Sequence, residues 1–465
     1  MNSKINSKKT TFSGSVGFVL VAAGSAVGVG NIWRFPYLCA KNGGGLFLAV
    51  YLVLVLTFGF ALLITDIAIG RKTKDHVVNA YSKIKSKWKP LGIATFAVPC
   101  LIMTYYPVIG GWITKYIVEY TISDGAAAAG DGFFTSFITS NSSIAYTMVF
   151  LILTAAIVLS GVEKGIEKCS KYIMPALLLL IIGLTVYALT LKETVNGETR
   201  TGIEGLVYFL KPDLAHLTVK SFFDAVIDAM GQLFFSLSVG MGIMITYGSY
   251  VKDDVDLIKS TNQIEIFDTG VAVLAGMMIV PIVYVFLGTD GMSAGPGLTF
   301  ISMPKVFAVM GPIGKYLGFA FFLALGFAAL TSCISVMETI VANFMEIFDT
   351  SRKKVSIITA VIAAVAAAAI CLGYSGLYFE IILPNGAAAQ LLDLVDYVSN
   401  NVLMPLVALF SAIFVGWVVE PDFVISEAVR NGETFNREKM YRITIKYVIP
   451  VMMLILFATS SGLVG

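Results

Sequence analysis

Val27-Gly28-Val29-Gly30 and Val239-Gly240-Met241-Gly242 each interrupt a long apolar run, at about the same position in the two halves of the chain. In the hydrocarbon core of a bilayer, a helix opens only where it lines a cavity or is buried in protein, because its freed N–H and C=O groups need partners. Corresponding interruptions in two halves are typical of the binding site of a secondary transporter. Glycine also serves close packing between membrane helices, so packing is the alternative for each stretch taken alone.

The composition places the chain among membrane proteins. Of its 465 residues, 57% are apolar and 13% are charged, whereas soluble domains carry about 25% charged residues. About 20 apolar residues cross a bilayer core about 30 Å thick. The sequence therefore predicts a single all-α integral membrane domain over residues 1–465, with eleven transmembrane helices near 14–40, 45–70, 90–123, 144–160, 168–191, 221–250, 262–288, 313–347, 355–373, 387–417 and 440–463.

The basic residues predict how these spans are oriented. Lysines and arginines precede spans 1 and 11 and gather after spans 2, 4 and 8, where the set after span 4 is Lys164, Lys168 and Lys171. The loop 124–143 carries neither residue type. By the positive-inside rule, we expect a multi-pass protein with a cytoplasmic N-terminus and an extracellular C-terminus. The short termini and the lack of long outer loops favour the cell inner (plasma) membrane. A net charge of +2 gives no indication of nucleic-acid binding.

No catalytic arrangement stands out in the sequence. The two histidines fall in loops, and the five cysteines lie in or beside different spans without the spacing of a metal-ligand set. The spans contain no Ser/His/Asp arrangement and no evident pair of catalytic carboxylates. We therefore expect that the protein is not an enzyme.

Polar side chains inside the spans are few and lie on a small number of segments. A charge at the bilayer centre costs about 2.5 to 3.5 kcal/mol on insertion scales, so such residues mark functional sites. Carbonyls, hydroxyls and a carboxylate suit a hard cation such as Na⁺, and helix N-termini suit an anionic group. This chemistry fits an amino acid carried with sodium. The residues concerned are Ser25, Asn31, Arg34, Gln232, Ser236, Ser238, Asp268, Thr331, Ser332, Glu338, Asp393 and Asp396.

The run from Gly24 to Pro36, GSAVGVGNIWRFP, is similar to the first-span signature of the neurotransmitter:sodium symporters, whose fold is that of the leucine transporter, LeuT. The resemblance continues through spans 3, 6 and 8, at Tyr105-Tyr106, 235–250 and 328–332. It implies a LeuT-like 5+5 inverted repeat, with spans 1–5 over 12–192, spans 6–10 over 219–417 and an additional span 11 over 438–464. It also implies that spans 1 and 6 are unwound at the midplane.

The same resemblance implies two sodium ions beside the substrate. The first ion would bind Ala26, Asn31, Ser236 and Asp268, and the second would bind Gly24, Val27, Ala328, Thr331 and Ser332. Gly28 and Gly30 would offer N–H groups to the substrate carboxylate, with help from the Tyr106 hydroxyl. Relatives that need chloride have a neutral Asn where this chain has Asp268, so we expect transport without chloride. The alternative is that Asp268 pairs structurally with another polar residue.

By resemblance, the substrate pocket has walls without a charged side chain. We therefore expect a neutral, hydrophobic or aromatic amino acid as the substrate. The flexible Met241 tolerates varied shapes, so aliphatic and aromatic side chains both stay open. The residues of this pocket are Ser25, Ala26, Gly28, Val29, Gly30, Ile102, Tyr106, Phe235, Ser236, Ser238, Met241, Ser332 and Val336.

The family pattern also implies two gates. Arg34 and Asp396, with Tyr106 and Phe235 beneath them, would close the outer side, and Lys9, Glu346 and Tyr250 would close the inner side. This chain departs from the pattern at Phe12, where relatives usually have Trp. Acidic positions of the family match Asp66 and Glu338, which we assign to a structural hydrogen-bond network.

Two further features leave alternatives open. Gly165 and Pro175 have a spacing that in bacterial relatives is associated with unwinding that hydrates the second sodium site, but an ordinary proline kink is the alternative. A proton-coupled or exchange transporter on the same fold, or a receptor that binds amino acids without moving them, is the alternative to a sodium symporter. The oligomeric state is open.

Overall fold

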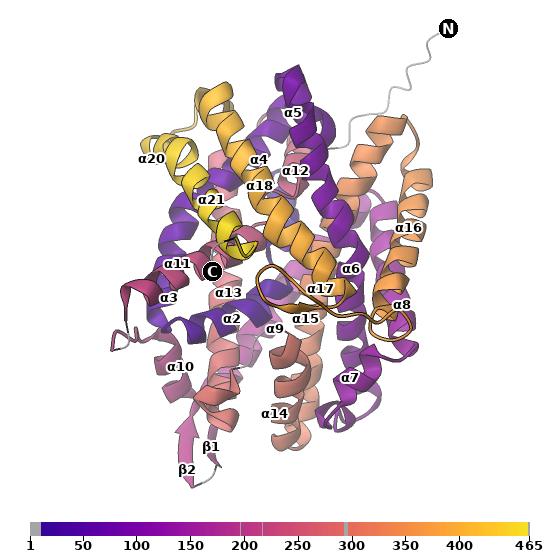
Figure 1. The fold of residues 1–465 in the computed structure, drawn as a ribbon, viewed down its shortest axis with the longest axis vertical. Coiled ribbons are helices and arrows are strands. Elements are labelled where there is room, and N and C mark those ends of the chain that lie inside the picture. Colours follow the sequence, from indigo (N-terminus) through magenta and orange to yellow (C-terminus); the bar gives the residue numbers. More distant parts are fainter. Residues whose placement is uncertain (1–10, 196, 216, 293–295, 464–465) are drawn as a thin grey trace.

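The structure is a computed structural model that describes residues 11–195, 197–215, 217–292 and 296–463. In these residues the regular structure is almost entirely helical, and it includes two short antiparallel hairpins. Figure 1 shows the long helices running along the longest axis, with the β1–β2 hairpin and α14 at the end opposite α5 and α20. The all-α prediction is confirmed.

The first half of the chain forms ten helices and one hairpin. A π-helical turn over Val55–Gly59 joins α3 to α4, and a second over Val162–Glu167 leads into α9. The elements are α1 (Ser15–Ala26), α2 (Val29–Lys41), α3 (Gly45–Leu54), α4 (Phe60–Thr73), α5 (Val77–Ile84), α6 (Lys89–Ile122), α7 (Phe133–Ile138), α8 (Ser142–Leu159), α9 (Lys168–Thr190), β1 (Lys192–Val195), β2 (Glu198–Thr201) and α10 (Gly202–Leu210).

The second half repeats the pattern of one broken helix followed by long helices. A π-helical turn over Tyr397–Leu403 joins α17 to α18, and another over Thr444–Val448 joins α20 to α21. The elements are α11 (Val219–Ser236), α12 (Ile243–Tyr250), α13 (Leu257–Leu287), α14 (Met303–Val309), α15 (Pro312–Phe348), α16 (Arg352–Leu372), β3 (Ile381–Ile382), β4 (Ala388–Ala389), α17 (Leu391–Asp396), α18 (Met404–Ile413), α19 (Asp422–Ala428), α20 (Glu438–Ile443) and α21 (Ile449–Ser460).

Ten of the predicted spans have counterparts among the described helices. Nine helices are long and apolar enough to cross a membrane, and α1 with α2 makes a tenth candidate, bent by 53° at its break. The predicted span 221–250 corresponds to α11 and α12, which are not among these candidates. Its break is longer, because six residues separate Ser236 from Ile243.

Glycine and serine conformations explain the longer break. Ser238, Gly240 and Gly242 all have φ in the left-handed region, at 53°, 72° and 72°. Continuous right-handed helix is impossible through such residues. The break between α1 and α2 is tighter, since Ala26 ends one helix and Gly28 caps the next.

Packing brings the two breaks together. α4 lies against α12, α6 lies along α15, and α13 contacts both α1 and α2. Side chains at these contacts form one large cluster of buried apolar residues, which includes Val27 and Met241. The breaks therefore lie inside the protein, where their free backbone groups can face a cavity instead of lipid.

Candidate functional site

A cavity of about 30 Å³ lies between the two helix breaks and is completed by α6 and α15. Twelve of the thirteen predicted substrate residues line it, and Val29 does not. Sequence reasoning missed Ile243, the first residue of α12. The lining residues are Ser25, Ala26, Gly28, Gly30, Asn31, Ile102, Tyr106, Phe235, Ser236, Ser238, Met241, Ile243, Ser332 and Val336.

Hydroxyl groups connect the breaks across this cavity. The Ser238 hydroxyl donates to the Ser25 carbonyl at 3.0 Å, and the Ser332 hydroxyl donates to the same carbonyl at 3.3 Å. The Ser25 hydroxyl donates to Ser238 Oγ at 3.2 Å. These bonds occupy a carbonyl that the end of α1 leaves without a helical partner.

The backbone at Gly28 leaves room on the cavity side. A Cβ at Gly28 would lie 3.2 Å from Ser332 Oγ and 3.8 Å from the Tyr106 hydroxyl, so a side chain here would intrude on the cavity. The Gly28 N–H, predicted to bind a substrate carboxylate, donates to Asn31 Oδ1 at 3.0 Å in this structure. Gly28 and Tyr106 thus lie on the same cavity, and their binding of a substrate carboxylate stays a prediction.

Asp268 lies at the centre of a buried polar cluster beside the cavity. Its Oδ1 accepts from Asn31 Nδ2 at 2.7 Å and from the Ser236 hydroxyl at 2.8 Å. Its Oδ2 is buried without a hydrogen-bond partner among the described residues. A buried carboxylate oxygen without a partner is costly. The amide, hydroxyl and carboxylate oxygens gathered here are the ligands that a hard cation prefers.

The residues predicted for a second cation also come together, where α1 meets α15. A Cβ at Gly24 would lie 3.4 Å from Thr331 Cβ. The Thr331 hydroxyl donates to the Ala328 carbonyl at 3.1 Å, so these two oxygens lie side by side. Val27 follows α1 as its C-cap and is fully buried. The set offers carbonyl and hydroxyl oxygens but no carboxylate, because no Asp or Glu belongs to it.

Asp66 on α4 touches the second break directly. Its Oδ2 accepts from the Gly240 N–H at 3.3 Å, and the residue is buried. An N–H group freed by the break thus finds a partner in a neighbouring helix. This contact agrees with the structural role that the sequence analysis assigned to Asp66.

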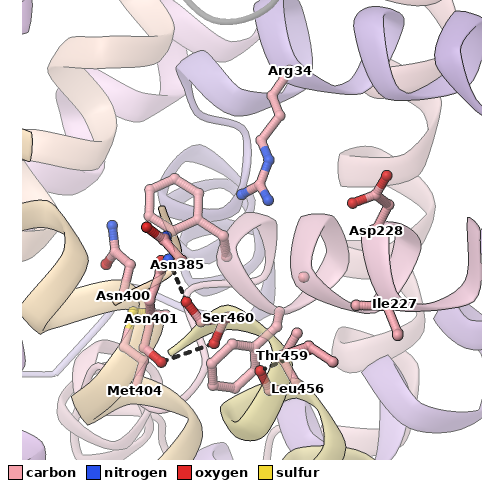
Figure 2. Close-up of a pocket in the computed structure, with 13 residues that line it drawn as sticks. Arg34, Ile227, Asp228, Asn385, Asn400, Asn401, Met404, Leu456, Thr459 and Ser460 are labelled. Carbon is pink, nitrogen blue, oxygen red and sulfur yellow. Dashed lines mark hydrogen bonds between the residues drawn. The ribbon is translucent and has the colours of Figure 1, made fainter. Parts of the chain in front are cut away.

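A vestibule of about 290 Å³ opens above the cavity on one side. Figure 2 shows the Arg34 guanidinium pointing into it, with Asp228 across the space. The predicted partner of Arg34, Asp396, accepts instead from Asn400 Nδ2 at 2.6 Å, and Arg34 makes no ion pair within the described part of the chain. Phe235 lines both the vestibule and the cavity. The predicted outer ion pair is therefore not formed in this structure.

The end of α21 forms part of the vestibule wall, which sequence reasoning did not anticipate. Asn401 Nδ2 donates to the Ser460 carbonyl at 3.2 Å, and the Ser460 hydroxyl donates to the Asn401 carbonyl at 2.9 Å (Figure 2). Tyr397 donates to the Ser461 carbonyl at 2.7 Å. No sequence signal predicts this contact, because it joins residues about 60 positions apart.

Aromatic rings and a buried ion pair seal the opposite end. Phe12 is 1% exposed and packs edge-on against Tyr247 and Tyr250, with ring centroids 5.8 Å apart in each pair. The Tyr250 hydroxyl donates to Glu338 Oε1 at 2.7 Å, and Arg352 donates to both oxygens of Glu338 at 2.6 and 2.7 Å. A bidentate pair of this kind fixes geometry strongly.

Of the predicted inner-gate residues, Tyr250 takes part in this seal. Glu346 instead accepts from Asn79 Nδ2 at 2.8 Å and from the His76 N–H at 3.3 Å. Lys9 lies outside the described residues. Sequence reasoning missed Arg352, which it counted only as a loop charge, although a conspicuous basic run marks its position.

The segment between Gly165 and Pro175 is wound in this structure. A π-helical turn over Val162–Glu167 continues into α9, which contains Pro175. Glu167 accepts from the Ser13 N–H at 2.9 Å and also from the Ser13 hydroxyl. The start of α9 is thus tied to the residues that precede α1.

Known proteins resemble this chain over nearly its whole length. The model of the sodium:neurotransmitter symporter family matches residues 9–124 and 134–463. The uncharacterized sodium-dependent transporter YhdH of Bacillus subtilis is 33% identical over 98% of this chain and 99% of its own. The human sodium- and chloride-dependent taurine transporter is 26% identical over 89% of this chain and 72% of its own. A crystal structure of MhsT in complex with L-phenylalanine matches with a TM-score of 0.83 and 34% identity, over 97% of this chain and 99% of that one.

Proposed function

This chain belongs to the sodium:neurotransmitter symporter family, and on that premise we propose that it imports a neutral, hydrophobic or aromatic amino acid together with sodium. The family consists of sodium-dependent membrane transporters, so the chain is not an enzyme. We further propose eleven spans, with α11 and α12 counted as one broken span. The inverted repeats over 12–192 and 219–417, the additional span over 438–464 and the predicted orientation in the inner membrane belong to the same proposal.

The single observation that carries the proposal is the unpartnered Oδ2 of Asp268. It is buried beside Asn31 and Ser236 at the edge of the cavity. A sodium ion there would neutralise the carboxylate, and a substrate carboxylate could complete the ion's oxygen shell. Sodium and substrate would then stabilise each other, which is the physical basis of coupled transport. We assign the second ion to Gly24, Val27, Ala328, Thr331 and Ser332.

The apolar side of the cavity supports the substrate class. Ile102, Met241, Ile243 and Val336 contribute no charge that could pair with a charged substrate side chain. At about 30 Å³ the cavity is small, so an aromatic substrate requires side-chain movement. Met241 is the most adaptable of these walls. The L-phenylalanine bound to MhsT supports the choice of an aromatic or large aliphatic amino acid.

Asp268 also supports transport without chloride. A fixed carboxylate supplies the negative charge beside sodium that an anion would otherwise provide. The related taurine transporters are named as sodium- and chloride-dependent. This proposal therefore separates the chain from them by its anion requirement.

Uptake by the purified chain in proteoliposomes tests the proposal. With a panel of labelled neutral amino acids, we expect accumulation driven by an inward sodium gradient and abolished when choline replaces sodium. Replacing chloride by gluconate should leave uptake unchanged. Loss of uptake in gluconate alone would contradict the chloride part, and accumulation without sodium would contradict the whole proposal. Binding without accumulation or counterflow would favour a receptor.

Asp268→Asn tests the role of the carboxylate. We expect the apparent affinity for sodium to fall at least about tenfold, since hydrogen bonds and contacts to charged groups contribute about 1.5 to 3 kcal/mol. Asp254→Asn removes an exposed carboxylate of the loop before α13 and serves as the matched control. Equal sodium affinity in both variants would refute the assignment of the first ion to Asp268.

A further inference from the structure

A groove of about 390 Å³ lies on the outer surface where α8 ends and α9 begins. Ile157 of α8 and Ser160, which caps that helix, form one wall, and Lys164, Lys168 and Tyr172 form the other. It is separate from the substrate cavity and from the vestibule, with which it shares no lining residue.

Close backbone packing builds the floor of this groove. A Cβ at Gly165 would lie 2.1 Å from the Ile157 carbonyl oxygen, so only glycine allows the π-helical turn to approach α8 this closely. Gly161, with φ of 89°, makes the turn between the two helices. The groove is therefore a consequence of the fold, and its walls are fixed relative to each other.

Two uncompensated positive charges line one side. Lys164 and Lys168 are exposed and four residues apart, so their side chains lie on the same face. Neither makes an ion pair or hydrogen bond with another described residue, and the exposed Glu163 pairs with neither of them. Lys171 differs, because it binds Glu167 at 2.8 Å on the side facing Ser13. The two groove lysines are thus free to bind an anion.

The other surroundings of the groove are apolar. Tyr172 is 71% exposed, and the surfaces of α8 and α9 beyond it carry Leu153, 50% exposed, and Leu179, 70% exposed. In a membrane protein such exposed apolar side chains face lipid chains, and Tyr is enriched at the boundary between headgroups and hydrocarbon. A ligand here would meet cations at one end and apolar surface at the other.

The groove also lies at the basic end of the molecule. Arg352 Nη1 donates to the Val158 carbonyl at 3.2 Å, and Ser13 lies beside Glu167, so the groove adjoins residues that the positive-inside rule assigns to the cytoplasmic side. Anionic lipids of a cytoplasmic leaflet attract basic residues near the surface. We propose that this groove binds an anionic phospholipid, with its phosphate at Lys164 and Lys168 and its acyl chain along Ile157 and Tyr172.

Native mass spectrometry of the full chain in detergent tests this binding. The probes are phosphatidylglycerol and phosphatidylcholine with the same acyl chains, titrated separately. We expect the wild type to prefer phosphatidylglycerol. The double variant Lys164→Gln/Lys168→Gln should lower the affinity for phosphatidylglycerol roughly thirtyfold, which is the effect of two cations near a membrane surface. Binding of phosphatidylcholine should not change.

Matched variants and an anion complete the test. The double variant Lys85→Gln/Lys87→Gln removes two exposed lysines elsewhere and should keep the preference for phosphatidylglycerol. Tyr172→Ala should lower the affinity for both lipids. Unchanged melting temperatures will show that the variants fold. Equal phosphatidylglycerol affinity in the two lysine double variants would overturn the proposal. Displacement of the lipid by millimolar inorganic phosphate would also overturn it, in favour of a simple anion site. Neither outcome bears on sodium-driven uptake.

Discussion

The two ends of the pathway through this protein differ in what holds them. At the end where Phe12 lies, three aromatic rings pack together and Glu338 binds both Arg352 and Tyr250. At the vestibule end, Arg34 faces about 290 Å³ of open space and Asp396 binds Asn400 instead of Arg34. One end is sealed by buried, charge-assisted contacts, and the other end lacks the ion pair predicted for its gate.

The difference shows which contacts select this conformation. The Glu338 carboxylate is fully buried, so separating it from Arg352 would leave a charge without compensation. Opening the sealed end therefore requires this buried charge to be compensated in another way. A cycle of alternating access must offset this cost, and in the proposed function the binding of sodium and substrate near Asp268 supplies the free energy.

The largest effect is expected from Arg352→Gln, which would break the sealed end. Removing one partner of a buried ion pair costs about 3 to 5 kcal/mol, so the population open at the Phe12 end should rise steeply. The measurement is maleimide labelling of a cysteine introduced at Ser335, a buried neighbour of Tyr247, in a background without the native cysteines. Lys353→Gln removes a neighbouring exposed charge and should leave labelling unchanged. Equal labelling of both variants would contradict the seal.

Tyr250→Phe should destabilise the seal at the Phe12 end less than Arg352→Gln does. It removes one hydrogen bond to a charged group, worth about 1.5 to 3 kcal/mol, but keeps the ring that packs on Phe12. Labelling at position 335 should rise to a level between those of the wild type and Arg352→Gln. Tyr81→Phe also removes a buried hydroxyl, one that bonds the neutral Ser411, and serves as the control. A Tyr250→Phe effect larger than that of Arg352→Gln would mean that the hydroxyl of Tyr250 contributes more to the seal than the ion pair does.

Arg34→Gln should have the smallest effect on the stability of this conformation. Because Arg34 makes no ion pair here, its loss should change the free energy of unfolding by less than about 1 kcal/mol. Uptake should nevertheless fall, because the Arg34–Asp396 pair predicted for the closed vestibule would no longer form. Melting temperature and sodium-driven uptake, measured on the same preparation, separate the two effects. A large loss of stability with normal uptake would refute the role of Arg34 as a gate.

The sequence predicted much of the candidate site because short motifs carry local chemistry. Gly28, Gly240 and Gly242 lie at the helix breaks, where glycine adopts extended or left-handed backbone at little cost. Asn31 and Asp268 are polar residues inside apolar spans, where contact with lipid is unfavourable. Resemblance to a family then supplied the pairing of distant residues. Ile243 was missed because nothing local distinguishes it from any apolar residue that follows a break.

Contacts between segments far apart in the chain could not be predicted from the sequence. The contact of Ser460 with Asn401, the ion pair of Arg352 with Glu338 and the groove at Lys164 each depend on how whole helices lie against one another. Whether the outer gate is open or closed also depends on how the helices pack. Arg34 and Asp396 were predicted as partners, and only their positions in space show that the pair is absent in this structure.

By itself, the sequence determined the membrane class, the helical fold and the two glycine-broken segments, because hydrophobicity and backbone conformation are properties of single residues and their near neighbours. The tertiary structure alone decided which end is sealed and which polar atoms lack partners. These depend on distances between residues far apart in the chain, and hydrogen bonds and ion pairs form only over a narrow range of such distances.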